Sequence, residues 1–174
     1  MENRKYPIGD FTDKGDYSAE EIASFLEVLG NFPEKLEHLV SDITEEELNT
    51  PYREGGWTAQ QVIHHIADSH MNMLVRLKWT LTEETPPIKA YFEDRWATLS
   101  DYTLPIGVSV SMLKAIHAKV VALLENLNEV ELNKGYFHPE FKKIWPLKSV
   151  MALYAWHGEH HLAHIKISKG EWSF

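Results

Sequence analysis

The chain has 174 residues, about the length of one ordinary domain, and we expect a single domain over 1–174. Its 17 Lys and Arg against 26 Asp and Glu give a formal net charge of -9. This balance argues against nucleic acid or an anionic membrane as a partner, because both require a basic surface. The composition therefore favours a small-molecule ligand.

Cysteine is absent, which excludes disulfides, cysteine nucleophiles and thiolate metal ligands. Any metal ion must be bound by His, Asp or Glu, and the chain has 10 histidines. The amino terminus has no apolar signal segment, and the longest apolar stretches are shorter than the ~18 residues that span a membrane. We expect a cytoplasmic protein.

Four segments have the apolar spacing of amphipathic helices. In the first, Ser18 followed by Glu21 matches a capping box, and apolar residues at helical spacing continue to Val40. Similar patterns predict three further helices, the first of them capped by Thr58, over about 58–82, 109–127 and 147–167.

We find no convincing strand pattern, so the predicted fold is all-α, a four-helix bundle. The connections 83–108 and 128–146 are too long for tight turns, which predicts at least one long crossover connection. Aromatic residues in them either wall a pocket or anchor the loops. They are Tyr91, Phe92, Trp96, Tyr136, Phe137, Phe141 and Trp145.

The last predicted helix contains a cluster of histidines: His157, His160, His161 and His164. Helical residues four apart lie about 40° apart around the axis and about 6 Å apart along it, so two such pairs could each share a metal ion. Relative to the charged face of this helix, the pair His157/His161 points more directly toward the core. We prefer this pair as metal ligands to the alternative that they are ordinary core histidines.

The pattern excludes two known kinds of metal site. A zincin requires Glu directly after the first His, and Gly158 stands there. A di-iron bundle requires Glu-x-x-His pairs, which are missing. A single metal ion with mostly nitrogen ligands fits better.

The second predicted helix offers His64, His65 and His70. Periodicity alone favours His70, which lies near the centre of the apolar face. His65 lies on a neighbouring polar stripe, which is either solvated or lines a water-accessible cleft. Spacing does not decide between His65 and His70 as the ligand. The remaining histidines are interpreted as structural or surface residues: His38, His117 and His138.

Several motifs give the chain a resemblance to a known family. They are the segments 50–58 (TPYREGGWT), 61–72 (QVIHHIADSHMN), 81–86 (LTEETP) and 156–164 (WHGEHHLAH), with 6–9 (YPIG) also fitting. The chain resembles the DinB-like superfamily and, within it, the YfiT type of metal-dependent hydrolase. The resemblance implies a four-helix bundle of non-simple connection order and a homodimer. It also implies a metal triad of His65, His157 and His161.

A three-His site leaves a coordination position open, which is typical of a catalytic metal. We expect one divalent ion, zinc or alternatively nickel. The expected function is a hydrolase that activates a metal-bound water. Alternatives are transfer of a low-molecular-weight thiol such as bacillithiol, held as thiolate on the same metal, and a non-enzymatic metal-binding module.

Weaker candidates for orienting ligands or substrate are Asp68, Ser69, Asn72, Arg76, Tyr154, Glu159, His160 and His164. No residue is assigned as general base.

Overall fold

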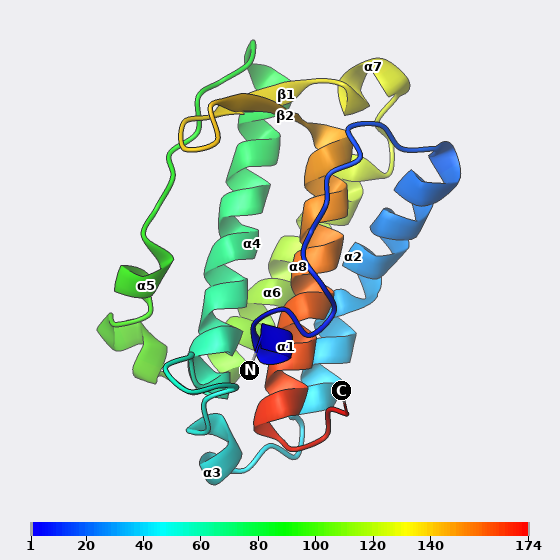
Figure 1. The fold of residues 1–174 in the computed structure, drawn as a ribbon. Helices are drawn as coiled ribbons and strands as arrows, with labels where there is room; N and C mark the ends of the chain where they lie inside the picture. The colour runs from blue at the N-terminus through cyan, green and yellow to red at the C-terminus, as the bar shows by residue number, and fades with distance from the viewer. Residues whose placement is uncertain (1, 174) are drawn as a thin grey trace.

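The computed structural model describes residues 2–173, with side chains from residue 4. Four long helices form a bundle: α2 (Ala19–Val40), α4 (Ala59–Thr82), α6 (Gly107–Leu124) and α8 (Leu147–Ser168) (Figure 1). The predicted fold class is therefore confirmed.

Local signals start the first two long helices as the sequence predicts. The Ser18 side chain accepts from the Glu21 amide and the Glu21 carboxylate accepts from the Ser18 amide, which completes a capping box. Thr58 and Gln61 make the same reciprocal bonds at the start of α4. These bonds satisfy amide groups that have no partner within the helix.

Short elements join the long helices. They are α1 (Glu2–Lys5), α3 (Glu45–Leu48), α5 (Glu93–Trp96), the 3-10 helix η1 (Ser100–Thr103), α7 (Glu129–Leu132), β1 (Gly135–His138) and β2 (Lys143–Pro146).

The expectation that the chain has no strands is wrong for β1 and β2, which pair as an antiparallel hairpin. Tyr136 lies opposite Trp145 and both are buried, whereas Phe137 and Ile144 are exposed. Strands of four residues are too short for alternation to stand out in a sequence.

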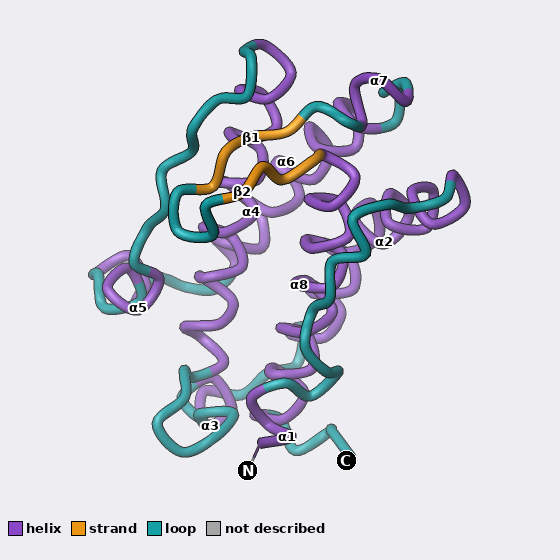
Figure 2. The backbone as a smooth tube through the Cα atoms, turned by 45° about the horizontal axis from the view of Figure 1, so that its top comes forward, coloured by secondary structure: helices purple, strands orange, loops and turns teal. Residues whose placement is uncertain are grey.

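The order of the helices around the bundle is not the simple one. Both α2 and α4 pack against α6 and α8, so consecutive long helices α2 and α4 lie diagonally opposite. The segment 83–106 returns along the length of the bundle, which makes α4 and α6 parallel (Figures 1 and 2). The predicted long crossover connection is confirmed in this segment.

Helix α6 is apolar and long enough to cross a membrane by length and composition alone. Its buried residues Val110, Leu113, Ile116 and Val120 face the bundle core, where α6 packs between α2 and α4. This is the behaviour of a core helix.

The segment before α2 runs along the outer side of α8 (Figure 1). The Trp156 indole donates to the Gly9 carbonyl at 3.2 Å, and the Phe11 ring packs against Trp156. Lys148 forms an ion pair with Asp16. The amino-terminal segment thus covers the helix that carries more histidines than any other, four of the 10.

Candidate metal centre

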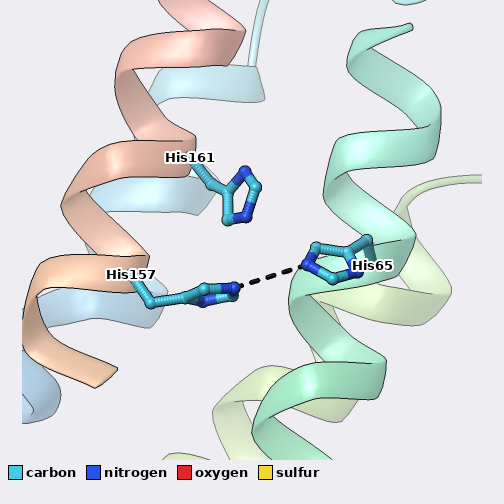
Figure 3. Close-up of side chains that lie close together, drawn as sticks. All are labelled: His65, His157 and His161. Carbon is cyan, nitrogen blue, oxygen red and sulfur yellow. Dashed lines mark hydrogen bonds between the residues drawn. The ribbon is translucent and has the colours of Figure 1, made fainter. Parts of the chain in front are cut away.

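Three histidines from two neighbouring helices come together inside the bundle. His65 projects from α4, and His157 and His161 project from successive turns of α8 (Figure 3). One nitrogen from each ring lies within 4.8 Å of the others, and the Nε2 atoms of His65 and His157 are 3.4 Å apart. The packing of α4 against α8 therefore places the three predicted ligands around one point.

The donor set fits a divalent metal ion. Zinc binds imidazole nitrogen at about 2.0–2.1 Å with tetrahedral angles, which places two nitrogens about 3.3 Å apart. The 3.4 Å between His65 and His157 matches this separation. Burial lowers the pKa of His65 to about 4 and holds those of His157 and His161 well below the usual value. All three rings are thus neutral at pH 7, the form that binds metal.

The three rings line a cavity of about 560 Å³. Ser69 and Arg76, which lie on the same polar stripe of α4 as His65, also line this cavity. Two of the aromatic residues from the connections, Tyr91 and Phe141, wall the cavity, whereas Tyr136 and Trp145 are buried in the core. The cavity is large enough for a small molecule next to the histidines.

Arg76 brings a positive charge to the cavity wall. Its side chain is buried, and Nη2 donates to the Lys89 carbonyl at 3.2 Å. Among the described residues, no ion pair involves Arg76. A buried guanidinium without a carboxylate partner favours an anionic group in the space that it faces.

Two phenols in the cavity wall are proton donors. The Tyr154 hydroxyl donates to the Ser69 carbonyl at 3.2 Å. Burial raises the pKa of Tyr154 and of Tyr91, so both hydroxyls stay protonated at neutral pH. The Tyr91 hydroxyl can donate a hydrogen bond to a substrate, whereas the single proton of Tyr154 is already donated to Ser69.

Three other predicted helpers do not line this cavity. The Asp68 carboxylate accepts from the Tyr102 hydroxyl at 2.8 Å, and Asn72 donates to the Asp68 carbonyl. Glu159 pairs with Lys35 at 2.8 Å on the outer surface. The structure thus places these three side chains outside the cavity wall, and a role for Asp68, Asn72 or Glu159 at the triad stays a prediction.

A second cluster, His160, His161 and His164, also places one nitrogen of each ring within 4.8 Å of the others. In this cluster, however, both nitrogens of His164 already have partners. Nε2 lies 3.2 Å from the Lys5 carbonyl, and Nδ1 lies 3.2 Å from Nδ1 of His161. His160 stacks on the Trp156 ring with centroids 4.4 Å apart. Both clusters line a cavity, and the first is the better metal site because, among the described residues, no backbone carbonyl accepts from its three rings, whereas the Lys5 carbonyl accepts from His164.

Two histidines behind the triad have roles that the sequence did not reveal. His70, which periodicity favoured as a ligand, is fully buried, and its Nε2 lies 3.3 Å from Nδ1 of His157. On the other side of His70, its Nδ1 lies 2.7 Å from Nε2 of His117, a residue of α6. The one available signal was that His117 falls on the apolar face of α6, between Leu113 and Val120. His138 also differs from the surface interpretation, since it lines the cavity.

Comparison with known proteins now places the chain in a family. The family model of the DinB superfamily matches residues 29–165, and the chain belongs to this superfamily. The chain is thus a DinB-superfamily protein with a four-helix bundle and a candidate metal site.

Particular relatives narrow the family to one type. A protein of Oceanobacillus iheyensis named "putative metal-dependent hydrolase" is 46% identical over 163 residues, covering 94% of each chain. YfiT of Bacillus subtilis, which carries the same description, is 43% identical and covers 94% of this chain and 92% of its own. A solved structure of YfiT matches with a TM-score of 0.93 at 42% identity, over 98% of this chain and 99% of that one. It is described as a "probable metal-dependent hydrolase with an unusual four-helix bundle topology".

Proposed function

We propose that this chain is a metal-dependent hydrolase of the YfiT type, acting on a small molecule with an anionic group. His65, His157 and His161 hold one divalent ion, zinc or nickel. The observation that carries the proposal is the convergence of three neutral imidazoles, two buried and one half-buried, on the wall of a cavity of about 560 Å³. The names of the YfiT-type relatives support the same class of reaction.

A divalent ion with three imidazole ligands keeps a position open and lowers the pKa of a water bound there toward ~7. The chain's own residues bind and orient the substrate. Arg76 attracts a carboxylate or phosphate group, and the hydroxyl of Tyr91 donates a hydrogen bond. The exposed carboxylates of Glu93 and Glu140 lie at the rim of the cavity. They disfavour a second anionic group there.

Metal analysis of matched variants tests the ligand set. We expect His65→Ala and His157→Ala to reduce zinc stoichiometry to near zero, because each removes one of three ligands. His160→Ala is the matched control, since it removes a ring of the second cluster only. Retained metal in His65→Ala with loss in His160→Ala would move the site to the second cluster.

The reaction is tested with the zinc-loaded protein and a panel of esters and amides, each in an anionic and a neutral form. We expect turnover with water alone and a preference for the anionic forms. Arg76→Met should remove that preference by raising KM for the anionic forms.

A parallel series with a model electrophile and low-molecular-weight thiols tests the alternative function. Turnover only in the presence of a thiol would replace the hydrolase by a thiol S-transferase on the same metal. Stoichiometric metal without turnover in either series would favour the non-enzymatic binding module.

A further inference from the structure

A line of buried histidines connects the triad to the far side of the bundle. His117 Nδ1 lies 2.6 Å from the Leu29 carbonyl oxygen of α2. A carbonyl oxygen only accepts, so this nitrogen carries the proton. Burial keeps the His117 ring neutral by lowering its pKa to about 4. Its other nitrogen, Nε2, therefore has a free lone pair and must accept.

The direction of the next two hydrogen bonds follows from the first. His70 Nδ1 lies 2.7 Å from His117 Nε2 and must donate to it. His70 Nε2 is then the acceptor for His157 Nδ1, 3.3 Å away. His157 thus carries its proton on Nδ1, and its lone pair lies on Nε2. That Nε2 is the atom that faces His65.

A second, shorter line of hydrogen bonds ends at His161, the other proposed ligand on α8. His164 Nε2 lies 3.2 Å from the Lys5 carbonyl oxygen and must donate to it. His164 Nδ1 then accepts from His161 Nδ1 at 3.2 Å. His161 is therefore also protonated on Nδ1, which leaves the lone pair of its Nε2 free.

We propose that two carbonyl-anchored lines of histidines fix the tautomer of both α8 members of the triad, so that each presents an unprotonated Nε2 to a metal ion. The first line is Leu29, His117, His70 and His157, and the second is Lys5, His164 and His161. His70, His117 and His164 are positioning residues, which act through a ligand and do not touch the metal.

The third member of the triad differs from the other two. His65 Nδ1 is buried and has no hydrogen-bond partner among the described residues. Its Nε2 lies 3.4 Å from the unprotonated Nε2 of His157 and must donate to it, so in the metal-free chain His65 carries its proton on the nitrogen that faces the other ligands. The site thus has two ligands on α8 that already present a lone pair and one on α4, His65, whose proton must move from Nε2 to Nδ1 before that Nε2 can bind a metal ion.

The first test needs no variant and no metal. Two-bond proton–nitrogen correlation spectra of the ¹⁵N-histidine-labelled, metal-free protein report which ring nitrogen carries each proton. We expect His157, His161, His70 and His117 to be protonated on Nδ1 and His164 on Nε2. Finding His157 or His161 protonated on Nε2 would overturn the proposal.

Variants of His117 test whether the line acts at a distance. His117→Leu removes the acceptor of His70 and should turn His70 and then His157 to the Nε2–H form. Zn²⁺ affinity, measured by competition with a chromophoric chelator, should fall about 10–100-fold. His117→Gln places an amide oxygen near the lost acceptor and should restore most of the affinity. Equal losses in both variants, with His157 unchanged in the spectrum, would mean that His117 is only a packing residue.

This inference deepens the proposed metal site, yet the two can fail separately. The tautomers are read in metal-free protein, whereas the proposed function requires the wild-type chain to bind Zn²⁺. Normal Zn²⁺ binding with a wrong tautomer removes the positioning role alone. The expected tautomers without Zn²⁺ binding contradict the proposed function and leave the histidine lines intact.

Discussion

Gly158 follows the first α8 ligand directly and lies against Phe32 of α2. A Cβ atom at this position would be 2.8 Å from the Phe32 ring. That ring in turn packs on His117 and His70, with centroids 5.3 and 5.2 Å away. Gly158, which rules out a zincin motif, therefore also has a structural role. Without a side chain, it lets α2 pack closely behind the triad.

Gly158→Ala should lower the free energy of unfolding by about 1–3 kcal/mol, the usual cost of inserting a methyl group into a packed interface. Urea unfolding of the metal-free protein measures it. Gly107→Ala at the start of α6 is the matched control, since a Cβ there meets nothing within 4 Å. It should leave stability unchanged or raise it slightly. Equal effects of the two substitutions would contradict the close packing.

At the scale of the elements, the end of α4 determines how the chain enters its long return segment. The helix ends at Thr82, and Thr85 then adopts φ 45° directly before Pro86. The next residues are held by β1, because the Phe137 amide donates to the Pro86 carbonyl and the Ile88 amide donates to the Phe137 carbonyl. A β-branched residue in the left-handed region is strained. Thr85 thus stays in this strained conformation because the hydrogen bonds to β1 fix the residues that follow it.

Thr85→Gly should relieve that strain and raise the free energy of unfolding by about 1 kcal/mol. The greater conformational entropy of glycine in the unfolded chain offsets part of this gain. Thr82→Gly is the control, because it puts glycine into the last turn of the helix and should destabilise. Thermal unfolding of both variants beside the wild type distinguishes them. A lower melting temperature for Thr85→Gly would show that its conformation is not strained.

For the molecule as a whole, the buried histidines link folding to pH. Burial lowers the pKa of His117 and of His164 to about 4, against about 6.5 in an unfolded chain. Between these values the unfolded chain binds protons that the folded chain does not bind. Their contribution to stability is thus complete above pH 6.5 and is lost as the pH falls toward 4.

Lowering the pH from 7.5 to 5 should therefore reduce the urea midpoint of the metal-free protein. Each such histidine contributes up to about 1.4 kcal/mol per pH unit in the titrating range. His117→Gln should make the decrease smaller, whereas His38→Gln should not, because His38 is exposed. A midpoint that does not change between these pH values would refute this linkage.

Two expectations at this scale stay predictions: that the protein is a homodimer and that it works in the cytoplasm. Light scattering of the purified chain checks the first of them.

Features that depend on residues close together in the chain could be predicted from the amino-acid pattern. Capping boxes and apolar periodicity gave the long helices, and a spacing of four residues placed His157 and His161 on one face of α8. Periodicity also identified His70 as buried, but it could not say what His70 would meet. The resemblance, and not the periodicity, selected His65.

Contacts between residues of different helices could not be predicted in this way, because they arise from the packing of the bundle. The approach of α4 to α8 brings His65 to the pair on α8, and the approach of α6 and α2 brings His117 and the Leu29 carbonyl behind them. The Lys5 carbonyl arrives from a segment about 160 residues earlier in the chain. Such contacts depend on the angle and register between helices, which the whole core fixes and no local pattern encodes.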